Sequence, residues 1–239
     1  MTETDDLEGY QLPLSARVAA RAQVLSAQAY RAILERSATD PQAAEAHADC
    51  IAWCEREGLQ SEFEPQEWAL ISTPLGQLSQ RDEVNASWLT EPAVCLAWAL
   101  GQVDLPDYET EADGAAVATA LRFLDDAANG FRAQSELRPQ AELESLLETY
   151  LTLHWRLREF SLRPVHLDFA AFAGQCRWAN MRLDQVRLVD DDLSVGGSPL
   201  VTAPESLWRN CLSIASERHR AAEWLLGQHP LYSEVTADT

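Results

Sequence analysis

The segment from 204 to 227 constrains the fold of this chain more than any other stretch. It reads PESLWRNCLSIASERHRAAEWLLG, in which Pro204 suits the start of a helix and Gly227 suits its end. Apolar residues recur at spacings of three and four along two neighbouring stripes that together cover about two thirds of the helix. A helix this apolar is packed on by several others, so we expect it to be the central helix of the fold.

Two polar residues interrupt the apolar stripes of this helix. Arg218 lies in one stripe and His219 in the other, and a guanidinium keeps its charge when it is buried. We therefore predict that Arg218 is buried and bonded to a carboxylate, with Glu142 or Glu148 as the first candidates. One explanation is an ion pair that fixes the register of the helix. The alternative is a polar pocket lined by Glu217, Arg218 and His219.

The rest of the chain predicts a mainly α fold, a single multi-helix globular domain with one short β-hairpin near residues 185–201. The strands are QVRLV and LSVGGSPLV, joined by the acidic turn Asp190–Asp192. The helices are recognised by apolar residues at helical spacing, by caps and by prolines. Besides the helix described above, they are expected at 13–37, 41–57, 64–72, 79–100 with a break near 90–92, 115–127, 139–160 and within 166–180.

The chain divides into an N-terminal tail and one domain. Residues 1–12 are polar, which predicts a flexible N-terminus, and residues 13–239 form a chain long enough for one helical domain. The acidic segment 102–113 is the place where two lobes would meet if the domain has two.

The strong acidity of the chain excludes several classes of partner. Eighteen basic residues, all of them arginine, stand against 38 acidic ones and give a net charge of −20. A charge of this sign repels phosphate backbones and anionic lipids, so we expect neither nucleic acid nor membrane as a partner. The charge favours a basic protein partner, and it leaves the oligomeric state open.

The sequence predicts a cytoplasmic protein. The first ten residues, MTETDDLEGY, lack the basic and apolar parts of a secretory signal, and no apolar run reaches the roughly 18 residues of a membrane span. The five cysteines lie mostly within helical patterns, where a free cysteine behaves as a small hydrophobic residue. We therefore expect their thiols to be reduced.

One spacing in the sequence allows a metal site. His47, Cys50 and Cys54 share a helical face, but a closed site of these ligands takes a fourth group, and no neighbour supplies it. The run Asp190–Asp192 lacks the alternating oxygen ligands and the distal glutamate of a calcium loop, so it is predicted as a turn. We expect no metal and no other cofactor.

Four blocks spread along the chain form a recognisable pattern. They are RAQVLSAQAYRAILE, ASWLTEPAVCLAWALG, LRPQAELESLLETYLTLHW, and ERHRAAEWL with the closing ADT. In these blocks the chain resembles the family catalogued as domain of unknown function 4272, found mostly in bacteria, which implies a mainly helical protein with no established activity. The resemblance singles out eight positions, and the first role that it implies for them is in the architecture of the fold. They are Glu142, His154, Trp155, Glu217, Arg218, His219, Trp224 and Asp238.

The chain departs from the pattern of that family at two positions. The family has arginines where this chain has Leu89 and Thr152. Their loss weakens any polar site that the family shares at these places.

The function that the sequence favours is non-catalytic binding of a protein, in the manner of an immunity protein or an adaptor. No GxSxG, HExxH, P-loop or GxGxxG motif occurs, so no nucleophile, metal or phosphate cradle is recognisable. The alternative is a small enzyme with a polar pocket, in which His219, Glu217 and His154 act as acid and base groups. A deep pocket that holds these three residues favours the enzyme, whereas a shallow acidic face favours the binding protein.

Overall fold

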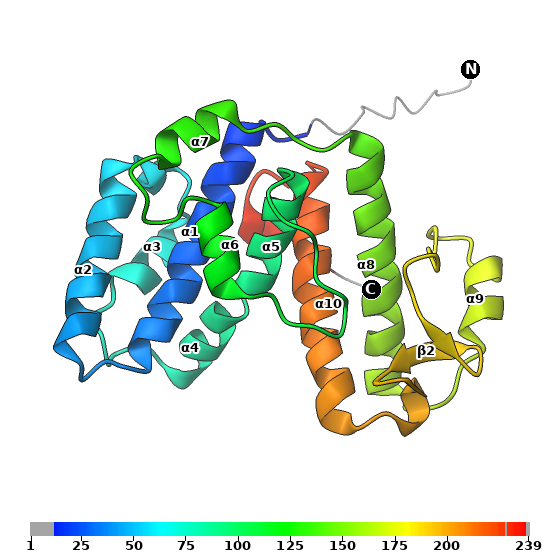
Figure 1. Cartoon of the computed structure of the whole chain (residues 1–239). Coiled ribbons are helices and arrows are strands. Elements are labelled where there is room, and N and C mark those ends of the chain that lie inside the picture. Colours follow the sequence, from blue (N-terminus) through cyan, green and yellow to red (C-terminus); the bar gives the residue numbers. More distant parts are fainter. Residues whose placement is uncertain (1–11, 228, 238–239) are drawn as a thin grey trace, which may run out of the picture.

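The computed structural model describes residues 12–227 and 229–237, and it is mainly helical (Figure 1). The predicted N-terminal tail lies almost wholly outside the described residues, as does Asp238. The helices are α1 (Ser15–Glu35), α2 (Pro41–Arg56), α3 (Pro65–Ser72), α4 (Gln80–Ser87), α5 (Thr90–Ala99), α6 (Gly114–Ala120), α7 (Ala128–Gln134), α8 (Gln140–Leu162), α9 (Phe169–Gln175) and α10 (Glu205–Leu225). Short 3₁₀ turns at Leu59–Ser61, Leu200–Thr202 and Tyr232–Glu234 complete the helical part.

The core is built around α10, which packs against α8 on one side and α5 on the other. In Figure 1 the elements follow one another from α2 through α1, α5, α10 and α8 to the small sheet and α9. Ile214, Ala215 and Leu225 of α10 have no exposed surface, as the two apolar stripes predict. The first turn differs, because Leu207 is exposed where the chain enters the helix.

Helix α1 joins the two clusters of buried side chains in the fold. Val18 and Leu25 belong to the larger cluster around α5, α8 and α10, and Val24 and Ala27 belong to a smaller one with α2 and α3. Because both sides of α1 are buried, these elements form a single mainly α domain.

The predicted break between 79 and 100 is confirmed. Helix α4 ends at Ser87 and α5 begins at Thr90, which places Pro92 in the first turn of α5. The backbone nitrogens of a first turn have no partner within the helix, so a proline costs no hydrogen bond there.

The prediction of a helix over 115–127 is wrong at its C-terminal end. Helix α6 stops at Ala120 because Arg122 and Leu124 adopt the left-handed backbone region, with φ of 54° and 61°, which L-residues rarely enter. The chain then restarts as α7, which the sequence did not predict.

The β region is a three-stranded antiparallel sheet where a hairpin was expected. Its strands are β1 (Leu188–Val189), β2 (Asp192–Val195) and β3 (Ser198–Pro199), and β2 pairs with both of the others. Gly196 and Gly197 have φ of 62° and 76°, which suits the tight turns that reverse an antiparallel chain. The second predicted strand therefore folds back on itself.

Candidate functional site

Arg218 is fully buried on α10 and forms an ion pair with Glu91 of α5. Its Nε and Nη2 lie 2.8 and 2.7 Å from one carboxylate oxygen. Its Nη1 also donates to the hydroxyl of Tyr150, at 2.8 Å, and to the carbonyl of Pro106, at 2.7 Å. Its Nη2 donates to the carbonyl of Thr110. The guanidinium thus ties α5, α8 and the segment 102–113 to α10, which is the architectural explanation of its burial.

The prediction that Arg218 is buried and bonded to a carboxylate is confirmed, but the predicted partners are wrong. Glu142 is exposed and lies 3.1 Å from Arg138, and Glu148 accepts a hydrogen bond from Asn180. The contact with Arg218 comes instead from Tyr150, which lies on the inner side of α8.

His154 of α8 and His219 of α10 form a buried pair. Their Nδ1 atoms lie 3.2 Å apart, so one ring donates a hydrogen bond and the other accepts it. Burial lowers the pKa of His154 to about 4, with help from Arg158 and Arg220, and it lowers the pKa of His219 to about 3, with His154 adding to the effect. Both rings are therefore neutral at pH 7, and the pair joins two helices inside the core.

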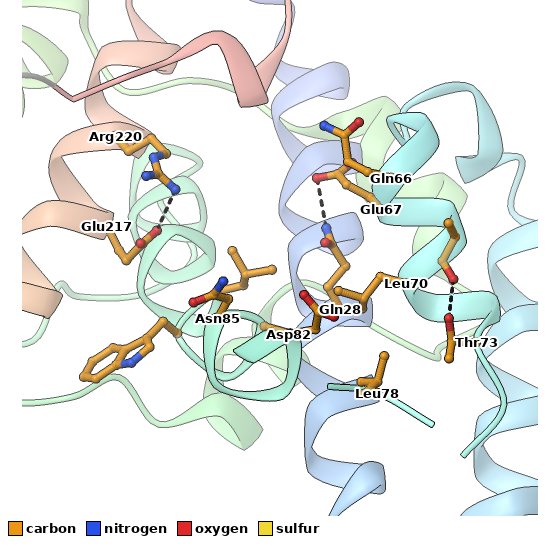
Figure 2. A pocket seen from close by; sticks show the side chains of 14 residues that line it. Gln28, Gln66, Glu67, Leu70, Thr73, Leu78, Asp82, Asn85, Glu217 and Arg220 are labelled. Carbon is orange, nitrogen blue, oxygen red and sulfur yellow. Dashed lines mark hydrogen bonds and ion pairs between the residues drawn. The ribbon is translucent and has the colours of Figure 1, made fainter. Parts of the chain in front are cut away.

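Glu217 and Arg220, from the solvent side of α10, line a hollow of about 580 Å³ (Figure 2). In Figure 2 the two side chains lie on one wall, opposite Gln66 and Glu67 of α3, and Gln28 of α1 lies below Glu67, to which it is hydrogen-bonded. The Glu217 carboxylate lies 3.5 Å from Nη1 of Arg220, and burial raises its pKa above the usual range. The remaining lining residues are Ala69, Leu70, Thr73, Leu78, Asp82, Asn85, Ala86, Trp88 and Leu89.

A second hollow of about 400 Å³ continues the first one. The two share Asn85, Trp88 and Glu217, and we call the combined depression the polar groove. His154 lines the second hollow, whereas His219 is completely buried behind it. The groove therefore brings together two of the three acid and base candidates, and the third has no access to solvent.

Glu142 lines a different depression, of about 740 Å³, between residues 104–108 and α8. Asp104 and Asp107 also face it, and Trp98 and Leu105 contribute apolar surface. We call it the acidic cleft. Of the five candidate residues from the sequence, His154 and Glu217 thus line the polar groove, Glu142 lines the acidic cleft, and Arg218 and His219 are buried in the core.

A second buried ion pair joins Arg156 of α8 to Asp192. The sequence did not predict this pair. The guanidinium donates to both carboxylate oxygens, at 2.7 and 2.6 Å, and both side chains are fully buried. The prediction that all of Asp190–Asp192 is a turn is therefore wrong at its last residue, which begins β2. An arginine on the apolar side of α8 was the signal that could have found this pair.

His47, Cys50 and Cys54 share one side of α2, but they do not form a metal site. The ring of His47 is bonded through Nε2 to the carbonyl of Ile71, at 2.6 Å, and Cys50 and Cys54 pack in the core. Within 12–227 and 229–237, no group of three or more histidine, cysteine or acidic side chains is arranged to hold a metal. The five cysteines are free thiols.

The two tryptophans singled out by the resemblance are packing residues. Trp155 stacks on Phe172 of α9, with ring centroids 4.2 Å apart, and Trp224 meets the ring of Tyr232 edge to face. They hold α9 and the C-terminal 3₁₀ turn against the helices.

The family model described as domain of unknown function (DUF4272) matches residues 4–168. The chain belongs to this family. The match contains α1 to α8 and therefore Glu91 and His154, whereas Glu217, Arg218 and His219 lie beyond it. Neither the curated proteins nor the solved structures contain a match to the chain. Among the described residues, no helix has the length and apolar character needed to cross a membrane.

Proposed function

We propose that this protein is a non-catalytic binding module of the cytoplasm that holds a basic protein partner, in the manner of an immunity protein or an adaptor. The observation that carries the proposal is the acidic cleft, in which an apolar wall lies within an acidic rim. Apolar contact supplies affinity at such a surface, and complementary charge supplies orientation and association rate.

The arginines of the chain are almost all neutralised within it. Fifteen of the eighteen lie within ion-pair distance of a carboxylate in the described part of the chain, leaving Arg81, Arg158 and Arg177. The exposed carboxylates of the described residues, such as Asp104, Glu142, Glu45 and Asp49, therefore give this part of the chain an acidic surface. Such a surface attracts a cationic protein over a distance of about 10 Å at moderate salt.

The acidic cleft concentrates this charge beside apolar surface. Asp104 and Glu142 are exposed at its rim, and hydrogen bonds from Arg187 lower the pKa of Asp107, which keeps that carboxylate charged. The cation that lines the cleft, Arg182, is bonded to Asp184 at 2.6 Å. An arginine or lysine of a partner would thus meet the carboxylate of Asp104, which has no ion pair among the described residues, beside the paired carboxylates of Glu142 and Asp107. Its aliphatic part would pack on Leu105.

The buried histidine pair argues against catalysis at the polar groove. A general base works best with a pKa near the operating pH, and burial holds the pKa values of His154 and His219 at about 4 and about 3. His219 has no exposed surface, and Arg218 is saturated by its contacts with Glu91 and backbone carbonyls.

The alternative function is a small enzyme, and one observation favours it: His154 and Glu217 line the same hollow. In that case Glu217, whose pKa is raised by burial, would donate a proton and His154 would accept one. A turnover that Glu217→Gln abolishes while the free energy of unfolding is unchanged would establish the enzyme and overturn the binding proposal.

Affinity capture with a charge-matched control tests the binding proposal. The immobilised protein is compared with the double variant Asp104→Asn, Glu142→Gln and with the control Glu45→Gln, Asp49→Asn on α2, whose side chains are also exposed. A basic protein should be enriched at low salt, released at raised salt, and lost from the cleft variant alone. Equal loss from both variants, or no enriched basic protein, would contradict the proposal.

A further inference from the structure

The polar groove has a composition that differs from the rest of this acidic surface. Its two hollows, of about 580 and 400 Å³, meet at Trp88, Asn85 and Glu217. Sites for small ligands have volumes of about 300–1,000 Å³, so either hollow alone reaches that range. The groove extends from α3 to α8 across α4 and α10.

The α8 end of the groove holds an arginine that is not paired with Glu217, the carboxylate of the same hollow, which lies beside Arg220. Arg158 is exposed there, and no carboxylate of the described residues lies within ion-pair distance of it, although a hydroxyl lies at 3.5 Å. This is unusual, because fifteen of the eighteen arginines have an ion pair within the part of the chain that the structure describes. Ser213 and Ser216 add hydroxyl groups to the same hollow. Both Arg158 and Arg220 lie close enough to lower the pKa of His154, so their positive charge acts on the ring that lines this hollow.

The α3 end is anionic. Glu67 is fully engaged, since Arg21 donates to one of its oxygens and Gln28 to the other. Asp82 is exposed, and its only side-chain partner in the described part of the chain is the hydroxyl of Ser79. The carboxylate of Asp82 is therefore available to a cation at this end.

Beside these two ends, the groove carries amide groups, one large ring and the carboxylate of Glu217. Gln66 and Asn85 are exposed at the groove, and each amide both donates and accepts hydrogen bonds, as a peptide group does. Trp88, half-buried in both hollows, offers an apolar surface with an indole N–H. Amides that alternate with apolar surface fit the backbone and side chains of a peptide.

We propose that the polar groove binds the C-terminal end of a peptide, with the terminal carboxylate on Arg158 and the amino or guanidinium group of another residue of the peptide on Asp82. A ligand with an anionic and a cationic end satisfies both ends of the groove, whereas a purely cationic or anionic one satisfies only one. The site is separate from the acidic cleft, and its occupation does not depend on the basic partner proposed above.

Synthetic peptides with altered ends test this inference. A pool of tripeptides and tetrapeptides with free termini and one lysine or arginine each is titrated into the full chain. The indole N–H signal of Trp88, assigned with Trp88→Phe, reports binding by NMR. We expect saturable shifts with the free pool, and at least tenfold weaker binding when the same pool is amidated at its C-terminus.

Two variants with the same change of charge locate the site. Arg158→Gln should weaken binding at least tenfold, whereas Arg177→Gln, which also lacks an ion pair in the described residues, should leave it unchanged. Equal binding of the amidated pool, equal loss in both variants, or no shift of Trp88 would overturn the inference. A shift of the same size with inorganic phosphate alone would also overturn it, in favour of a simple anion site. None of these outcomes bears on the acidic cleft, which the Asp104 and Glu142 variants probe.

Discussion

Replacing Arg218 by methionine tests the clamp at the centre of the fold, because it removes the guanidinium and its charge and keeps an unbranched side chain as far as the position of Nε. Within the described residues, the change would leave Glu91, whose side chain is 3 % exposed, with one hydrogen bond, from the backbone N–H of Ala112. The carbonyls of Pro106 and Thr110 would lose their donor as well. Stranding one partner of a buried ion pair costs about 3–5 kcal/mol, and we expect the free energy of unfolding to fall by that amount.

Denaturation in urea, followed by circular dichroism, measures this loss. The control is Arg209→Met on the same helix, which breaks an exposed pair with Glu205 and should change the free energy of unfolding by no more than about 0.5 kcal/mol. Combining Arg218→Met with Glu91→Met should cost less than the sum of the two changes, since neither charge is then stranded. A loss below about 1 kcal/mol for Arg218→Met, or simple additivity in the double variant, would refute the reasoning.

Three further predictions concern protons, the sheet and the thiols. Burial depresses the folded pKa values of His154 and His219, so the unfolded chain takes up protons first as the pH falls from 6.5 towards 4. Each histidine then removes about 1.4 kcal/mol of stability per pH unit, and urea denaturation of His219→Gln should show a flatter pH dependence; parallel curves would contradict this. Asp192→Asn should lower the midpoint of thermal unfolding far more than Asp190→Asn, because it strands the buried guanidinium of Arg156. Under denaturing conditions all five cysteines should react as free thiols without stoichiometric zinc, and a smaller thiol count would speak against the reduced state.

Local signals in the sequence were enough to predict the long helices. In α2, Asp40 caps the helix, and Pro41 starts it at the predicted residue. In α8 and α10, apolar residues recur with the helical period over several turns. The side of each helix that is buried can therefore be predicted before its neighbours are known. The burial of Arg218 followed in the same way, because a guanidinium within an apolar stripe has to be paired.

The partners of these residues depend on tertiary structure and were not predictable from spacing. Arg218 meets Glu91 across 127 positions of the chain, and the sequence offers 38 carboxylates without ranking them. The polar groove could not be foreseen either, since its walls come from α1, α3, α4, α8 and α10. The break after α6 rests on two residues with positive φ, Arg122 and Leu124, neither of which is of a type that favours that conformation.

Zero-length carbodiimide coupling of the protein to its captured partner tests the binding proposal most directly. The reagent joins carboxylates to lysines, and this chain contains no lysine, so every link to a lysine identifies a contact with another protein. We predict that mass spectrometry finds the links concentrated at Asp104, Asp107 and Glu142 of the acidic cleft. Links that are spread evenly over the surface carboxylates, or that gather on α2 at Glu45 and Asp49, would contradict the account.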